Sequence, residues 1–114
     1  MSFKPVVSRR AEIDLARQYR WYLDNAGGEV AERYLAAFDA SMAEVATHPA
    51  LGKACRFRSP ELAGMRWRSV AGTFSAHLFF YRIVDGEVSI ERVMHGARDL
   101  PRRLMEPPEG GRAT

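Results

Sequence analysis

Residues 77–100 read His-Leu-Phe-Phe-Tyr-Arg-Ile-Val-Asp-Gly-Glu-Val-Ser-Ile-Glu-Arg-Val-Met-His-Gly-Ala-Arg-Asp-Leu, and this stretch decides the fold. Aromatic and β-branched residues dominate 79–84 and 88–94, a composition typical of β-strands. Asp85-Gly86 separates the two segments and suits a two-residue type I′ turn, because both central positions of that turn require positive φ. The stretch therefore predicts a β-hairpin followed by a short polar ending at residues 95–100.

Two amphipathic helices are predicted upstream of the hairpin. The first covers residues 9–26 with Ser8 as its N-cap, and its apolar positions follow the spacing of one buried face: Leu15, Tyr19, Tyr22, Leu23 and Ala26. The second covers residues 29–47 and shows the clearest apolar face: Val30, Tyr34, Leu35, Phe38, Met42 and Val45. Gly27-Gly28 separates the two helices and Pro49 prevents continuation of the second, so we expect an antiparallel helical hairpin.

The remaining segments complete an α+β pattern. Residues 3–7 read as a short first strand, and Pro5 indicates an edge position because proline cannot donate to a ladder. A basic loop at 49–64 leads into a strand at 65–71. The order β-α-α-β-β-β predicts a helical hairpin packed on one face of a mostly antiparallel, four-stranded sheet. We expect residues 1–100 to form a single domain and residues 101–114, with three prolines and two glycines, to form a flexible C-terminal tail after a possible final turn.

Length and composition narrow the possible classes of protein. The chain has 114 residues and a formal net charge of +3, which permits an acidic partner. No apolar run approaches the ~20 residues needed to span a bilayer, and the N-terminus lacks a secretion signal. The lone Cys55 cannot form an intramolecular disulfide, and no Cys/His cluster suggests a metal site. We therefore expect a cytoplasmic protein without metal, cofactor or membrane partner.

The hairpin and its polar ending, His-Gly-Ala-Arg-Asp-Leu, resemble the closing hairpin of the ParE branch of the ParE/RelE toxin superfamily. Other parts are similar in the same order: residues 8–15, His48-Pro49, Leu51-Gly52, residues 57–62 and residues 64–66. The resemblance spans roughly residues 3–100. It implies a toxin that a co-encoded ParD-type antitoxin neutralises in a hetero-oligomer and that inhibits DNA gyrase, with nucleic acid contacted only indirectly.

The turn also predicts which residues share a face of the sheet. In the resulting register Arg82 opposes Ser89, Phe80 opposes Glu91, Leu78 opposes Val93, and Ala76 opposes His95. One face then collects residues that should lie under the helices: His77, Phe79, Tyr81, Ile83, Val88, Ile90, Arg92 and Met94. The opposite face, if open, exposes Leu78, Phe80, Arg82, Glu91, Val93 and His95, which is more apolar than a bare surface tolerates.

Two interpretations of this second face remain open. An antitoxin segment lies across it, or the 49–64 loop or the C-terminal tail covers it as ordinary core. Trp21 lies off the main stripe of its helix among several arginines, and it either packs on their stems or anchors an interface. The candidate antitoxin-binding residues are therefore Trp21, Leu78, Phe80, Arg82, Glu91 and Val93.

The alternative function is a ribosome-dependent mRNA endonuclease. Its acid–base candidates are Arg82, His95 and Arg98, with Lys53 and Arg56 as phosphate binders. This set is incomplete, and the polar ending favours the gyrase-directed branch, so we assign no catalytic residue and favour a binding protein over an enzyme. A third alternative is a member of the superfamily that binds its partner but has lost toxicity.

The polar ending itself has two interpretations. His95 is interpreted as a structural, hydrogen-bonding residue. Arg98 and Asp99 form either an exposed ion pair or a clasp that holds the C-terminal segment to the sheet. His95, Arg98 and Asp99 are thus a signature with a structural or target-binding role.

Overall fold

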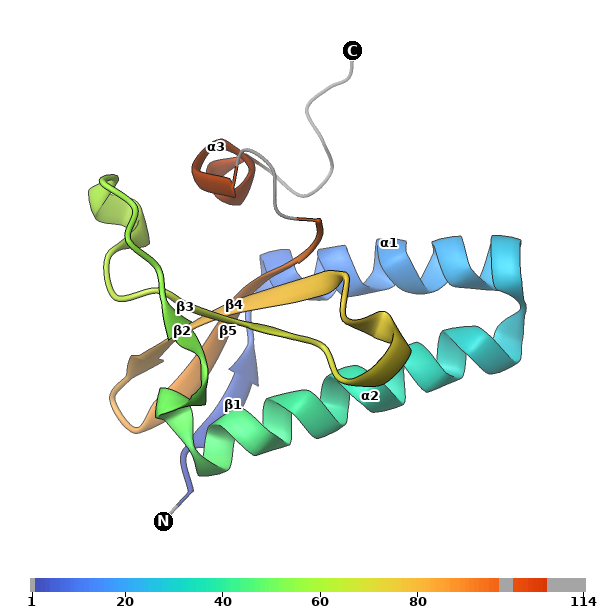
Figure 1. Ribbon diagram of the computed structural model, residues 1–114, viewed down its shortest axis with the longest axis horizontal. Helices are drawn as coiled ribbons and strands as arrows, with labels where there is room; N and C mark the ends of the chain where they lie inside the picture. Colours follow the sequence, from blue (N-terminus) through green and yellow to red (C-terminus); the bar gives the residue numbers. More distant parts are fainter. Residues whose placement is uncertain (1, 97–99, 107–114) are drawn as a thin grey trace.

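The computed structural model describes residues 2–96 and 100–106 (Figure 1). Its main elements are β1 (Lys4–Val7), α1 (Arg9–Ala26), α2 (Gly28–Thr47), β2 (Lys53–Ala54), β3 (Arg66–Ser69), β4 (His77–Val84), β5 (Glu87–His95) and α3 (Leu100–Met105). Three short 3-10 helices connect them: η1 (Pro49–Leu51), η2 (Pro60–Leu62) and η3 (Gly72–Phe74). The predicted α+β fold is confirmed.

In the described part of the chain the sheet has five strands in the order β1-β5-β4-β3-β2, one more than the four predicted. The additional strand is β2, a two-residue segment in the basic loop that pairs antiparallel with β3. A strand this short leaves no alternating pattern in the sequence, which is why it was not predicted. Among these described strands only β1 pairs in parallel, with β5, and it forms the edge that Pro5 indicated.

The two long helices begin and end where the local sequence dictates. The Ser8 side chain accepts a hydrogen bond from the Ala11 N–H at 3.1 Å and caps α1, as predicted. Gly27 has a φ of 96°, a backbone conformation that glycine adopts more readily than residues with a Cβ atom. The chain reverses its direction there and enters α2. The two helices then run antiparallel (Figure 1) and pack on the sheet around Tyr34, Phe38 and Phe79.

The β4–β5 hairpin confirms the predicted turn but only half of the predicted register. Asp85 and Gly86 both have positive φ, of 49° and 78°, as a type I′ turn requires. Arg82 pairs with Ser89 as expected. Farther from the turn the register shifts, because Tyr81 opposes Ile90 whereas Phe80 opposes Arg92. Glu91 is thus the additional residue of a β-bulge.

The bulge inverts the face assignment of every later residue of β5. Side chains alternate along a strand, so one inserted residue moves all that follow to the opposite side. Val93, predicted on the open face, is 1% exposed in the main core under the helices. His95 opposes His77 on the same side, with ring centroids 4.9 Å apart. Met94, predicted under the helices, packs on the other face. Arg92, also predicted under the helices, pairs with Phe80 of the second face. The predicted faces of all four residues after the bulge are therefore wrong.

The second face of the sheet is covered. Phe80 is fully buried and Leu78 is 8% exposed. They belong to a cluster whose buried members are Leu62, Met65, Leu78, Phe80, Met94 and Leu104, with Cys55, Phe57 and Trp67 packed against it. Residues of the 49–64 loop and of α3 therefore cover this face, which confirms the interpretation of Leu78 and Phe80 as core.

The C-terminal segment begins with a short helix. Residues 100–105 form α3, where the sequence allowed a final turn before the tail, and Leu104 is 3% exposed against the second cluster. A helix as short as α3 is not stable by itself, and the burial of Leu104 against the second face of the sheet stabilises it. Residues 107–114 of the predicted tail lie outside the described residues.

Within residues 2–96 and 100–106, no helix is long and apolar enough to cross a membrane. The same residues contain no group of three or more His, Cys, Asp or Glu side chains that could hold a metal ion.

Candidate functional site

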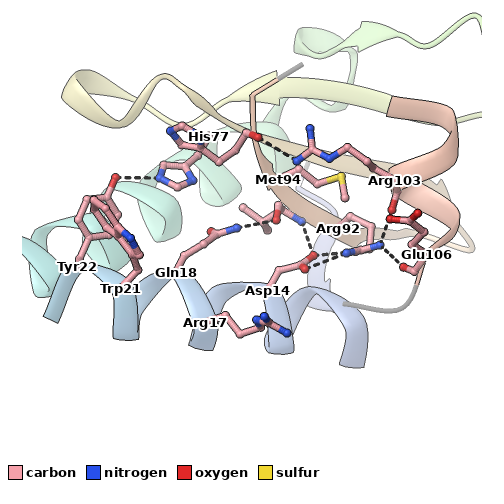
Figure 2. Close-up of a pocket in the computed structure, with 12 residues that line it drawn as sticks. Asp14, Arg17, Gln18, Trp21, Tyr22, His77, Arg92, Met94, Arg103 and Glu106 are labelled. Carbon is pink, nitrogen blue, oxygen red and sulfur yellow. Dashed lines mark hydrogen bonds and ion pairs between the residues drawn. The ribbon is translucent and has the colours of Figure 1, made fainter. Parts of the chain in front are cut away.

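A pocket of about 580 Å³ lies between α1, the end of the β4–β5 hairpin and the C-terminal segment (Figure 2). Three walls form it. Helix α1 contributes Asp14, Arg17, Gln18, Trp21 and Tyr22; the strands contribute His77, Arg92, Val93, Met94 and His95; and the C-terminal segment contributes Arg103 and Glu106.

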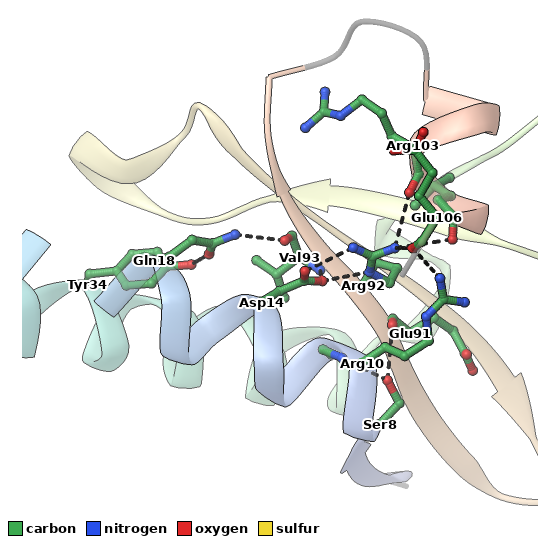
Figure 3. Close-up of polar contacts among 12 residues, drawn as sticks. Ser8, Arg10, Asp14, Gln18, Tyr34, Glu91, Arg92, Val93, Arg103 and Glu106 are labelled. Atoms are coloured by element: carbon green, nitrogen blue, oxygen red, sulfur yellow. Dashed lines mark hydrogen bonds and ion pairs between the residues drawn. The ribbon is translucent and has the colours of Figure 1, made fainter. Parts of the chain in front are cut away.

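A buried ion pair joins two of these walls. Arg92 donates from Nε to Asp14 Oδ2 at 2.7 Å and from Nη2 to Asp14 Oδ1 at 3.0 Å. The backbone N–H of Val93 donates to the same carboxylate at 3.0 Å. Both side chains are more than nine-tenths buried, so the two charges compensate each other out of water. The pair fastens α1 to β5 beside the bulge (Figure 3).

Sequence reasoning missed this pair. Asp14 lies off the apolar stripe predicted for α1, and charged residues are rarely buried without a partner. The buried face of α1 centres on Ala11 and Asp14, whereas Leu23, placed on the predicted stripe, is 36% exposed. One signal was present: Ala11, Asp14, Leu15, Gln18 and Tyr22 also follow the spacing of a single helix face.

Arg92 also fastens the C-terminal segment. Its Nη1 donates to the carbonyl oxygens of Arg103, Leu104 and Glu106 at 3.1, 3.3 and 2.8 Å. Carbonyl groups at the end of a helix lack partners within that helix, and a cation compensates them. Arg10 donates to the Glu106 carbonyl as well (Figure 3). The sequence offered Arg98 and Asp99 for such a clasp, and both lie outside the described residues. In the described part of the chain, Arg92 holds the C-terminal segment.

The far end of the pocket is aromatic. Tyr22 Oη and His77 Nε2 share a hydrogen bond of 2.8 Å (Figure 2), and the His77 ring lies 4.7 Å from that of Tyr34. Burial, together with the neighbouring His95, lowers the pKa of His77 from 6.5 to about 4. His77 is therefore neutral at pH 7. Trp21 packs edge-on against Tyr22, with ring centroids 5.4 Å apart, and remains 60% exposed.

Acidification tests this buried histidine. The unfolded chain gains a proton on His77 near pH 6.5, whereas the folded chain gains it only near pH 4. Stability that is present above pH 6.5 is therefore lost as the pH falls toward 4, by up to about 3 kcal/mol. Melting curves between pH 7.5 and 4.5 should show a smaller loss of stability for His77→Leu than for the wild type. Parallel profiles for the wild type and His77→Leu would contradict this result.

The predicted antitoxin-binding residues do not share one surface. Trp21 and Val93 line the pocket, Val93 from its buried place under the helices, whereas Leu78 and Phe80 lie under the loop and α3. Arg82 and Glu91 border a smaller pocket of about 260 Å³, with Arg82 Nε 3.7 Å from Glu91 Oε2. Arg82 also donates to the carbonyl oxygens of Glu61 and Ala63, which holds the loop over the sheet.

The predicted RNA-cleaving set is also dispersed. His95 ends β5, and its carbonyl accepts a hydrogen bond from Arg103 at 2.9 Å. Lys53 and Arg56 lie in and directly after β2, with β4 and β3 between β2 and β5 in the sheet. Lys53 Nζ lies 5.5 Å from the centroid of the Trp67 ring. The fold therefore does not bring the proposed phosphate binders to His95.

The fold has a counterpart among solved structures. A chain described as "Chromosomal ParDE TA system from P. aeruginosa" matches this one with a TM-score of 0.68, over 84% of this chain and 98% of that chain. The two sequences are 18% identical, so the likeness shows a shared fold. The helical hairpin on a mostly antiparallel sheet is thus a fold that this chain shares with that structure.

Sequence comparison then identifies the family. Toxin ParE1 from two strains of Mycobacterium tuberculosis, CDC 1551 / Oshkosh and H37Rv, is 30% identical over 105 residues, which cover 91% of this chain and 100% of each relative. The family model for the ParE toxin of the type II toxin–antitoxin system, parDE, matches residues 6–100. The chain belongs to this ParE toxin family, and the resemblance seen in its sequence is confirmed.

Proposed function

We propose that this ParE-family toxin inhibits DNA gyrase in the cytoplasm and that a cognate ParD-type antitoxin neutralises it. The observation that carries the proposal is the family match over residues 6–100, which extends from β1 through both long helices to the polar ending. The curated relatives named Toxin ParE1 match over their whole length, so the likeness is not limited to one shared motif.

The geometry of the site supports binding over catalysis. General acid–base chemistry needs groups that exchange protons near neutral pH and lie within reach of one another. His77 is buried, bonded to Tyr22 and held neutral by a pKa of about 4. Lys53 and Arg56 lie on the far side of β3 and β4 from His95. These positions favour gyrase inhibition over the alternative, ribosome-dependent mRNA cleavage.

A supercoiling assay tests the proposed target. The purified chain should inhibit supercoiling by gyrase and accumulate cleaved DNA, and its expression without a partner should leave bulk messenger RNA intact. Preincubation with the product of the small open reading frame beside the toxin gene is the control, and it should restore supercoiling. Codon-positioned cleavage of mRNA with gyrase unaffected would instead support the endonuclease. Antitoxin binding without either activity would support a member that has lost toxicity.

A further inference from the structure

We infer that Lys53, Arg56 and Arg58, at the β2 edge of the sheet, bind the phosphate backbone of double-stranded DNA without reading its sequence. The sequence offers Lys53 and Arg56 as phosphate binders for RNA cleavage, whereas the fold separates them from His95. The inference gives these cations a binding role instead of a catalytic one. It goes beyond the proposed function, because direct contact with DNA does not depend on which enzyme the toxin inhibits.

The β2–β3 segment, residues 53–68, concentrates the positive charge of the chain. It holds five Lys or Arg side chains and one acidic side chain, that of Glu61. The whole chain holds 17 basic and 14 acidic side chains, which leaves 12 against 13 outside the segment. The net charge of +3 therefore originates in this one segment. Positive charge gathered in one part of a surface is the electrostatic footprint of a nucleic-acid-binding protein.

Three of the five cations are available to a ligand. Arg66 and Arg68 bond within the chain, to a backbone carbonyl and to a carboxylate of α2. Lys53, Arg56 and Arg58 are exposed. In the part of the chain that the structure describes, their side chains form no hydrogen bond or ion pair. Their charges therefore face solvent without a counter-charge, and a phosphate can bind them without first breaking an internal contact.

The three cations lie close enough to contact one stretch of a duplex. The six residues from Lys53 to Arg58 span at most about 20 Å even when fully extended, which is less than one helical turn of about 34 Å. A duplex carries one negative charge per ~1.7 Å of its axis, so several phosphates lie within that reach. Among the described strands β2 is the outermost on its side of the sheet (Figure 1), which leaves this edge open to a large ligand.

The surface around the cations favours a duplex over other acidic partners. No large hydrophobic side chain within residues 53–68 is exposed, whereas protein interfaces are centred on such anchors. Single strands stack their bases on free aromatic rings. Phe57 and Trp67 instead pack on the second cluster, and Lys53 Nζ lies 5.5 Å from the centroid of the Trp67 ring. Binding to a duplex backbone requires only cations that reach phosphates.

The chain that carries these cations is held in place in the free protein. The Cys55 N–H donates to the Met65 carbonyl at 2.8 Å, which extends the pairing of β2 with β3. The Tyr81 hydroxyl accepts a hydrogen bond from the Gly52 N–H at 2.9 Å and donates to the Pro49 carbonyl at 2.6 Å. DNA therefore does not have to order this part of the chain, which lowers the cost of binding.

Fluorescence anisotropy of a labelled DNA duplex of about three helical turns, titrated with the purified chain, tests the inference. Log K should fall with log salt with a slope of about −2.7, the value for three phosphate contacts. The double variant Arg56→Gln, Arg58→Gln should weaken binding by about 10-fold or more at about 0.1 M salt and reduce the magnitude of the slope by about 2. Lys53→Gln should reduce that magnitude by about 1.

The double variant Arg20→Gln, Arg33→Gln is the matched control, because it removes the same charge from exposed positions on α1 and α2. At about 0.1 M salt the Debye length is about 10 Å, so charges outside the contact are largely screened. The control should therefore bind within about threefold of the wild type and keep its slope. An equal loss in both double variants would show that only net charge matters, and it would overturn the inference.

Three further outcomes would also overturn the inference: no duplex binding by the wild type, tighter binding of a length-matched single strand, or loss of antitoxin affinity but not DNA affinity in Arg56→Gln, Arg58→Gln. The last outcome would assign the surface to an acidic protein. The supercoiling assay is scored separately. Duplex binding by a chain that does not inhibit gyrase supports the inference and removes only the proposed target.

Discussion

Phe80→Ala is expected to lower the free energy of unfolding of the isolated chain by about 3–5 kcal/mol. Phe80 is fully buried between the 49–64 loop, α3 and the sheet, in contact with the cluster that includes Leu62 and Leu104. Truncation would leave a cavity where these three segments meet. Because domains of this size are stabilised by only about 5–15 kcal/mol, urea denaturation followed by circular dichroism should register a large shift of the midpoint.

Ile83→Ala is the matched control for Phe80. Ile83 lies on the same strand but is 44% exposed near the turn, so its truncation should cost less than about 1 kcal/mol. The sequence alone had allowed Phe80 to face a partner. A Phe80→Ala chain that keeps its stability and loses antitoxin binding would restore that interpretation.

Asp14→Ala is expected to destabilise the chain by about 3–5 kcal/mol, because it leaves the Arg92 guanidinium buried without its counter-charge. The same substitution removes the acceptor of the Val93 N–H, an additional buried donor. The attachment of α3 through Arg92 should loosen as well. Equilibrium unfolding measures the total loss, and hydrogen exchange in α3 measures the local one.

Two variants decide whether the ion pair causes this loss. Glu12→Ala removes an exposed carboxylate from the first turn of the same helix and should change stability by less than about 1 kcal/mol. The double variant Asp14→Ala, Arg92→Leu should regain part of the stability, since no unpaired charge remains buried. A loss below about 1 kcal/mol for Asp14→Ala would show that other contacts hold α1 to β5.

The errors of sequence interpretation concentrate at one residue. Asp85-Gly86 predicted the turn and the pairing of Arg82 with Ser89, but Glu91 is inserted as a bulge. No residue type marks that bulge: Glu91 is an ordinary strand residue in an alternating segment. A β-bulge bends its strand and increases the local twist, and the fit of that bend to the neighbouring elements exists only in the folded chain. The faces of Val93 and His95 were therefore beyond local prediction.

Some residues of the pocket could be identified from the sequence and others could not. Trp21 was identified as a candidate from its position among arginines, because an exposed aromatic on a charged helix face is visible in the sequence. Asp14 and Arg92 were not paired, since 78 residues separate them in the chain. Their partnership depends on the angle at which α1 crosses β5, and no periodicity encodes that angle.

By itself, the sequence determined the boundaries of the long helices, the turn of the hairpin, the α+β class and the family. These features depend on local spacing, caps and turn residues, which act within a few positions of the chain. Only the tertiary structure decided that the second face of the sheet is covered, that the C-terminal segment continues as α3, and that Arg92 fastens it. Those outcomes depend on contacts between distant segments, whose burial and charge compensation exist only after the chain has packed.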